Sequence, residues 1–244
     1  MIRAIFFDLD GTLRHNLPSG SEFFAEQAIR LGLHATGEDR LRAMRWEHYY
    51  WANSPELTAD RKTHLPDEGR FWGAIARRQL VALGASNEEA DRLAPLLNEY
   101  MRTEFKPRSV VPDDALRLLP ALKQDGYVLG LLSNRDQPFD EEVAQLGLDS
   151  FFELVLAGGP LKMWKPEPHL FMHACEQLKL QPAQAIYIGD NYFADVIGAR
   201  RAGLQPVLYD PRGIFDDPGC PIIRSFDELH GVLAADGRSR ITRS

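Results

Sequence analysis

The chain has 244 residues, 44% of them hydrophobic, and a formal net charge of -7 at pH 7, which fits a packed globular protein and argues against broad electrostatic binding of nucleic acid. No apolar run approaches the roughly 20 residues of a membrane span, and the start, MIRAIFFDL, is too short and too early charged for a secretory signal. Cys175 and Cys220 form neither a disulfide framework nor a zinc-binding spacing, so we expect two small core residues in a cytoplasmic protein.

The first predicted strand, IRAIFF at residues 2–7, runs directly into Asp8 and Asp10. Strand side chains repeat every two residues, so these carboxylates are expected on one side, where their charges repel. A divalent cation, a shared proton or exposure to water could each offset that repulsion.

The next segment, residues 15–106, has no convincing strand and predicts an inserted helical subdomain. From Ser21 to Phe105 the pattern is typical of four helices, broken by LGLHATG, by NSPEL together with HLPDEG, and by LGASN. A parallel crossover needs only about a dozen residues, so this segment is much longer than the topology requires. Pro107 and Pro112 bracket its return to the main sheet.

Apolar runs and helix-length segments alternate along the rest of the chain, which is typical of a parallel βαβ sheet with helices on both faces. The runs are YVLGLLS, ELVLA, AIYIG and QPVLYD, and helices are expected near 113–125, 139–147, 168–179 and 193–202. The predicted fold class is therefore α/β, with a core at 1–14 and 107–236, the helical insert at 15–106 and a flexible tail at 237–244.

Polar residues gather where the predicted strands end, which is where open parallel sheets bind their ligands. Each of them also has an ordinary explanation as a turn residue, a helix cap or a solvated loop residue. Their order of carboxylate, hydroxyl, lysine and carboxylate is nevertheless typical of a metal-dependent phosphate site. The segments are DLD with Asp8 and Asp10, SNRD beginning at Ser133, KMWKPEP with Lys165, and GDN with Asp190, followed by Asp195.

These segments resemble the motifs of the haloacid dehalogenase superfamily of hydrolases, most of which are phosphatases. DLDGT at residues 8–12 resembles the first motif, Ser133 the second, Lys165 of KP the third, and GDNYFAD at 189–195 the fourth. The resemblance implies a Rossmann-like core sheet, an all-helical cap of the first type formed by the insert, Mg²⁺ as cofactor, and a small phosphorylated metabolite as substrate. The net charge and the short apolar runs lead us to expect no nucleic-acid or membrane partner, and the oligomeric state is unknown.

The resemblance also implies how the carboxylates act. Asp8 would attack phosphorus and form an aspartyl-phosphate, while Asp10 would protonate the leaving alkoxide and then deprotonate the hydrolytic water. Mg²⁺ would be held by the carboxylates of Asp8 and Asp190 and by the main-chain carbonyl of Asp10. Asp195 would lie farther from the ion and would orient Lys165 or a metal-bound water.

The remaining motif residues would hold the phosphate. Ser133 and Lys165 would bind the transferring phosphoryl oxygens, and Thr12 and Asn134 are expected to bind phosphate or fix the loops. Gly11 would permit a tight turn at a point where a side chain would crowd the phosphate.

Asp10 also bears on the competing reactions. Dehalogenases that resemble this chain lack an acid two residues after the nucleophile, so Asp10 favours oxygen leaving groups. Phosphomutases keep that acid, but LRHNLPSG departs from the hinge pattern of the hexose phosphomutases, which favours net hydrolysis. A binding module on an inactive scaffold is the alternative from another class, although no motif residue is missing. GDNYFAD is similar to nucleotidase-like and acylneuraminate phosphatase-like members.

Weaker signals have two interpretations each. His169 and His173 have the spacing of a zinc pair on a helix but no evident third ligand. Trp46 and Tyr50 of WEHYYW share a helical face, which fits the core of the cap better than a substrate pocket. Arg14, His15 and Arg135 lie beside the motifs, where they either contact substrate or are solvated. Whether Arg45 meets substrate is also open.

Overall fold

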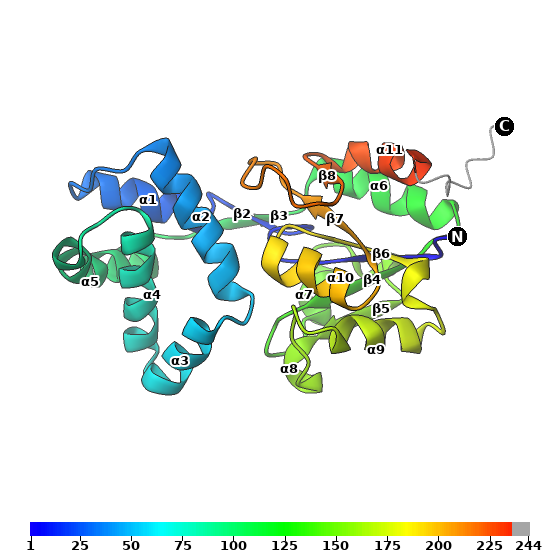
Figure 1. Ribbon diagram of the computed structural model, residues 1–244, viewed down its shortest axis with the longest axis horizontal. Helices are drawn as coiled ribbons and strands as arrows, with labels where there is room; N and C mark the ends of the chain where they lie inside the picture. Colours follow the sequence, from blue (N-terminus) through cyan, green and yellow to red (C-terminus); the bar gives the residue numbers. More distant parts are fainter. Residues whose placement is uncertain (236–244) are drawn as a thin grey trace. The chain divides into compact units, whose positions relative to one another are not determined.

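A computed structural model of the protein describes residues 1–235, and the chain divides into two compact units, Met1–His15 with Val110–Ser244, and Asn16–Ser109 (Figure 1). Both crossings between the units lie in a two-stranded sheet formed by β2 (His15–Leu17) and β3 (Arg108–Val110). The division therefore lies one residue and three residues beyond the boundaries expected at 14/15 and 106/107. The tail expected at 237–244 lies outside the described residues.

A six-stranded parallel sheet organises the first unit, in the order β5-β4-β1-β6-β7-β8. Its strands are β1 (Ala4–Phe7), β4 (Val128–Ser133), β5 (Leu154–Ala157), β6 (Ala185–Gly189), β7 (Gln205–Tyr209) and β8 (Ile222–Ile223). This sheet confirms the predicted α/β class and the five predicted strands. The two residues of β8 were not predicted, because so short a strand has no periodic pattern.

Helices cover both faces of this sheet because successive strand residues point to opposite sides (Figure 1). Ile5 and Phe7 belong to one apolar cluster, with residues of α6 (Asp113–Gln124), α7 (Asp140–Gln145) and α11 (Leu229–Ala235). Ala4 and Phe6 belong to the other, with residues of α9 (His169–Gln177) and α10 (Ile197–Arg201). The shorter helical pieces are α8 (Gly158–Leu161) and 3-10 turns at Asp149–Phe151, Pro182–Gln184 and Phe226–Glu228.

The helix expected over 193–202 begins differently. Tyr192–Val196 forms a single π-helical turn, in which the N–H of Ile197 donates to the carbonyl of Tyr192, and α10 follows it. The Asn191 side chain caps this turn by accepting hydrogen bonds from the N–H groups of Phe193 and Ala194, each at 3.0 Å. A π turn is a single wider turn of a helix, and the sequence pattern does not reveal it.

The second unit is all helical, with α1 (Gly20–Arg30), α2 (Gly37–Trp51), α3 (Pro55–His64), α4 (Glu68–Ala82) and α5 (Asn87–Thr103). The expectation of four helices is wrong, because NSPEL starts a helix rather than only ending one. Ser54 is its N-cap and accepts a hydrogen bond from the N–H of Leu57 at 3.1 Å, and Pro55 occupies the first helical position, which suits proline.

Aromatic residues of α2 pack inside this second unit. Tyr50 is fully buried, and Trp46 stacks on it with ring centroids 5.1 Å apart. The Tyr50 hydroxyl donates to Asp60 of α3 at 3.0 Å, and Arg78 of α4 donates to both oxygens of Asp60 at 2.7 and 2.9 Å. Trp46 and Tyr50 thus pack as part of the interior of the unit, as the packing interpretation expects.

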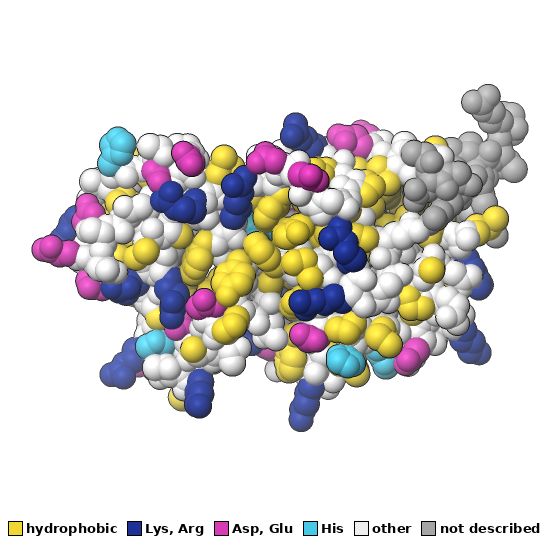
Figure 2. Space-filling model, in the orientation of Figure 1, with side chains coloured by type: hydrophobic (Ala, Val, Ile, Leu, Met, Phe, Trp, Pro, Cys, Tyr) yellow, Lys and Arg dark blue, Asp and Glu magenta, His cyan; other side chains and the backbone are white. Residues whose placement is uncertain are grey.

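The surface carries mixed charge. Figure 2 shows Lys and Arg side chains interspersed with Asp and Glu on the face drawn, and the described part of that face has no broad basic patch. Within residues 1–235, no helix has both the length and the apolar character needed to cross a membrane.

Candidate active site

The site begins where β1 ends. The N–H of Asp8 donates to the carbonyl of Ile188 in neighbouring β6 at 2.9 Å, which fixes Asp8 at the carboxyl edge of the sheet. The chain then turns tightly, with the N–H groups of Thr12 and Arg14 both donating to the carbonyl of Leu9 at 3.2 and 2.8 Å. Asp8, Thr12 and Arg14 are therefore held by backbone hydrogen bonds.

Two glycines make room for carboxylates. Gly11 has φ of +91°, and a Cβ there would lie 2.3 Å from Oδ2 of Asp190. At Gly189 a Cβ would lie 2.2 Å from Oδ2 of Asp195. The tight turn expected at Gly11 is present, but the side chain that it spares is that of Asp190.

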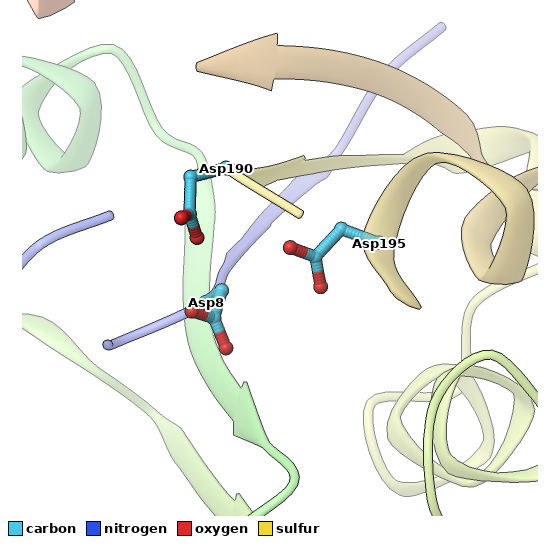
Figure 3. Close-up of side chains that lie close together, drawn as sticks. All are labelled: Asp8, Asp190 and Asp195. Atoms are coloured by element: carbon cyan, nitrogen blue, oxygen red, sulfur yellow. The ribbon is translucent and has the colours of Figure 1, made fainter. Parts of the chain in front are cut away.

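Asp8, Asp190 and Asp195 bring their carboxylates together from three different segments (Figure 3). Each offers an oxygen within 4.8 Å of the others, and Asp8 and Asp195 are buried. Among residues 1–235 this is the only group of three or more His, Cys, Asp or Glu side chains close enough to share an ion. His169 and His173 are not part of such a group.

Lys165 supplies the positive charge beside these carboxylates. Its Nζ donates to Asp8 and Asp195, each at 2.7 Å, and to the hydroxyl of Tyr187 at 2.9 Å. Tyr187 in turn donates to the carbonyl of Leu132 at 3.0 Å. Sequence reasoning missed Tyr187, although a tyrosine inside an apolar strand is itself a signal, because its buried hydroxyl requires a partner.

Asn134 and Thr12 hold other members of the site. Asn134 clamps the backbone of Lys165, since its Oδ1 accepts from the Lys165 N–H at 2.7 Å and its Nδ2 donates to the Lys165 carbonyl at 2.8 Å. The Thr12 hydroxyl accepts from the N–H of Asp190 at 3.0 Å and donates to its carboxylate at 3.2 Å. Both side chains thus fix loops. Ser133 is buried at the end of β4, directly before Asn134.

Asp195 has both oxygens engaged within the protein. Oδ1 accepts from Lys165, and Oδ2 accepts from the N–H of Asn191 at 2.9 Å. These bonds tie the π turn after β6 to the lysine. Within residues 1–235, the carboxylate of Asp190, by contrast, accepts one hydrogen bond, from Thr12.

Burial and mutual repulsion shape the electrostatics. Burial, with the nearby charges of Asp195 and Asp10, raises the pKa of Asp8 to about 7 despite the ammonium of Lys165. Burial and the charges of Asp8 and Asp195 raise the pKa of Asp190 well above its ordinary value. Burial alone would lower the pKa of Lys165, but Asp195 and Asp8 hold it well above the ordinary value. The Lys165 ammonium therefore bonds to two of the three carboxylates, and the three together form an oxygen donor set that suits a hard cation.

Asp10 has different partners. Its Oδ1 accepts from Arg14 at 2.6 Å and from Arg135 at 2.9 Å, and its Oδ2 accepts from Nε of Arg135 at 2.7 Å. Burial would raise the pKa of Asp10, but the hydrogen bonds and charges of the two arginines bring it below its ordinary value. Glu142 of α7 contacts both arginines, and nothing in its sequence position indicated this. Arg14 and Arg135 are thus paired.

His15 packs against the fold. Its Nε2 lies 2.8 Å from the carbonyl of Thr12, and its ring meets that of Tyr209 edge to face at 5.8 Å. Burial lowers the pKa of His15. The side chain therefore braces the turn after β1.

The chain is similar to proteins of known family and structure. A family model described as haloacid dehalogenase-like hydrolase matches residues 2–203. The chain is 29% identical to a glyceraldehyde 3-phosphate phosphatase of Methanopyrus kandleri over 89% of this chain and 87% of that protein. It is 27% identical to an (S)-2-haloacid dehalogenase of Burkholderia cepacia, over 87% and 84% respectively. A solved structure described as a predicted phosphoglycolate phosphatase of Haemophilus somnus shares the fold, with a TM-score of 0.60 and 22% identity over 95% of this chain and 98% of that one.

Proposed function

The chain belongs to the haloacid dehalogenase-like hydrolase family, and from that premise we propose that it hydrolyses the phosphate monoester of a small metabolite through an aspartyl-phosphate on Asp8. The observation that carries this proposal is the pairing of two differently held carboxylates two residues apart. Asp8 contacts Lys165 Nζ at 2.7 Å, and Asp10 is held by arginines outside that contact. One carboxylate is thus arranged to attack and the other to transfer protons.

Asp8 would attack phosphorus, and the leaving alcohol would take its proton from Asp10. In the second half of the reaction Asp10 would accept a proton from the water that hydrolyses the acyl phosphate. Lys165 and Ser133 would bind the phosphoryl oxygens, where negative charge builds up. The 2.7 Å contacts of Lys165 with Asp8 and Asp195 fit this role, because they hold the ammonium beside the carboxylate of the proposed nucleophile.

We propose that Mg²⁺ is held by the carboxylates of Asp8 and Asp190 and by the main-chain carbonyl of Asp10. The three buried or half-buried carboxylates offer oxygens within 4.8 Å of one another, and Lys165 bonds to two of them; this set of oxygen donors fits a hard divalent cation. Bound there, Mg²⁺ would offset the charge of the phosphate and align the reacting oxygens. Asp195 fits a supporting role, because both of its oxygens already bond to Lys165 and Asn191.

A phosphate-release assay tests the proposal. The panel includes sugar phosphates, nucleoside monophosphates, phosphoglycolate and an aryl phosphate, with Mg²⁺ or Mn²⁺ and with EDTA as the control. Release that requires the metal and is lost in Asp8→Asn supports the proposal. Halide release from a 2-haloacid without phosphate release would instead indicate the dehalogenase reaction, and tight binding of beryllofluoride or vanadate without turnover of any substrate would indicate a binding module.

A further inference from the structure

In the first unit, two carboxylates and two guanidinium groups contact one another: those of Asp10, Glu142, Arg14 and Arg135. Asp10 accepts three hydrogen bonds from the arginines, at 2.6 to 2.9 Å. On the other side, Glu142 contacts Nε of Arg14 at 2.9 Å and is hydrogen-bonded by both terminal nitrogens of Arg135. The charges balance, and each guanidinium lies between two carboxylates.

Arg135 is held in place independently of Asp10. Its guanidinium lies over the ring of Phe139, 5.3 Å from the centroid, and Phe139 is buried. Glu142 adds a second anchor from the first turn of α7. If the Asp10 carboxylate moved away, Arg135 would therefore keep two N–H donors in a fixed orientation. Such a pair of donors can bind both oxygens of another carboxylate.

Asp10 is the most exposed of the four side chains. Its side chain is 41% exposed, compared with 21% for Arg14, 24% for Arg135 and 31% for Glu142. A ligand would therefore reach the two arginines by displacing Asp10. In the proposed reaction Asp10 must also turn toward the ester oxygen. A carboxylate that replaces Asp10 beside the arginines would, together with Glu142, keep two guanidinium groups paired with two carboxylates.

We propose that Arg14 and Arg135 bind a carboxylate of the substrate, which takes the place of Asp10 and releases it toward the leaving oxygen. The inference rests on the proposed function and adds a substrate class to it. Because Asp10 reaches both the arginines and the ester oxygen, the carboxylate must lie close to that oxygen. The substrate is therefore the phosphate ester of a short hydroxy acid, and Arg14 and Arg135 determine the specificity.

Matched esters test this. 2-Phosphoglycolate is compared with 2-hydroxyethyl phosphate, and 3-phosphoglycerate with glycerol 3-phosphate, so that a carboxylate replaces a hydroxymethyl group in each pair. We expect kcat/KM to favour the acid by about 10- to 100-fold, the range of a charged hydrogen-bonded contact. In Arg135→Gln and Arg14→Gln the preference should fall about tenfold or more, whereas Arg117→Gln, which alters an exposed pair with Asp227, should keep it.

Binding is measured separately from turnover. In Asp8→Asn, phosphoglycolate should raise the melting temperature more than 2-hydroxyethyl phosphate does, and the added Arg135→Gln should remove that difference. Arg135→Lys keeps a charge for Glu142 but loses the fork, and it supplies the comparison if the glutamine variant does not fold. Its acid preference should fall between those of the wild type and Arg14→Gln.

The outcomes separate the two proposals. Failure to release phosphate from any ester, the aryl phosphate included, overturns the proposed function. Release with equal kcat/KM for acid and neutral partners, or an acid preference that survives both arginine variants, overturns the carboxylate site alone and leaves the four side chains as a structural ion-pair cluster. A preference for fructose 1,6-bisphosphate over fructose 6-phosphate without a carboxylate preference overturns the carboxylate assignment in favour of a second phosphate.

Discussion

Tyr187→Phe removes one oxygen atom from the interior of the site and tests how Lys165 is held. The hydroxyl accepts from Lys165 Nζ at 2.9 Å and donates to the Leu132 carbonyl at 3.0 Å, and Tyr187 is fully buried. A hydrogen bond to a charged group contributes about 1.5 to 3 kcal/mol and a neutral one about 0.5 to 1.5. The free energy of unfolding should therefore fall by about 2 to 4.5 kcal/mol.

Urea unfolding followed by far-ultraviolet circular dichroism measures this loss in metal-free buffer. Tyr100→Phe is the matched control, because Tyr100 lies exposed on α5 and should tolerate the same change. A loss below about 0.5 kcal/mol, the size of an ordinary surface substitution, would refute the reasoning. It would mean that the ammonium of Lys165 is held by Asp8 and Asp195 without help from the tyrosine.

Three further predictions follow from the contacts described. Asp8→Asn should abolish turnover and yield no labelled phosphoenzyme, because an amide cannot form the acyl phosphate; a persisting label would contradict the nucleophile assignment. Asp10→Asn should slow alkyl esters by about 10² to 10⁴-fold and aryl esters less, since an aryl leaving group needs less protonation, and equal losses would argue against its role as acid. Asp60→Ala should lower the free energy of unfolding by about 1 to 3 kcal/mol, because it leaves the buried Tyr50 hydroxyl without its acceptor, and an unchanged urea midpoint would show that the contact is dispensable.

Burial raises the pKa of the Cys175 thiol to about 11, so its reactive thiolate is scarce at pH 8 and becomes abundant only as the pH rises through that value. Iodoacetamide should therefore label Cys175 slowly at pH 8 in the folded protein and readily in urea, as mass spectrometry of the tryptic peptide can show. Rapid labelling of the folded protein would contradict the burial.

The sequence predicted the features that local patterns determine. Alternating apolar runs marked the five longer strands, and the order of polar residues at their ends marked Asp8, Lys165 and Asp190. Other contacts between residues far apart in the chain were not predictable. Glu142 reaches Arg14 from α7, and Tyr187 meets Lys165 across 22 residues. Neither contact can be inferred from the sequence pattern around either residue.

Turns were predicted less well than strands, for a related reason. NSPEL contains the residues of a loop, yet the same serine and proline begin α3, because a cap and a break use the same residue types. At Gly11 the conformation was predicted correctly but its neighbour was not, because Asp190 comes 179 residues later. The type of a residue determines which contacts are chemically possible, and the fold determines which other residue is close enough to make them.

The central position of β1 has a consequence for how the protein is assembled. Phe7 of β1 pairs with Leu131 of β4 on one side and with Ile188 of β6 on the other, so β1 is synthesised well before both of its partner strands. Pairings so distant in sequence close large loops and slow the search for the native state. Until residue 188 has been synthesised, the apolar strand that leads to Asp8 has an open edge, and such an edge on a nascent chain is prone to aggregation unless a chaperone covers it.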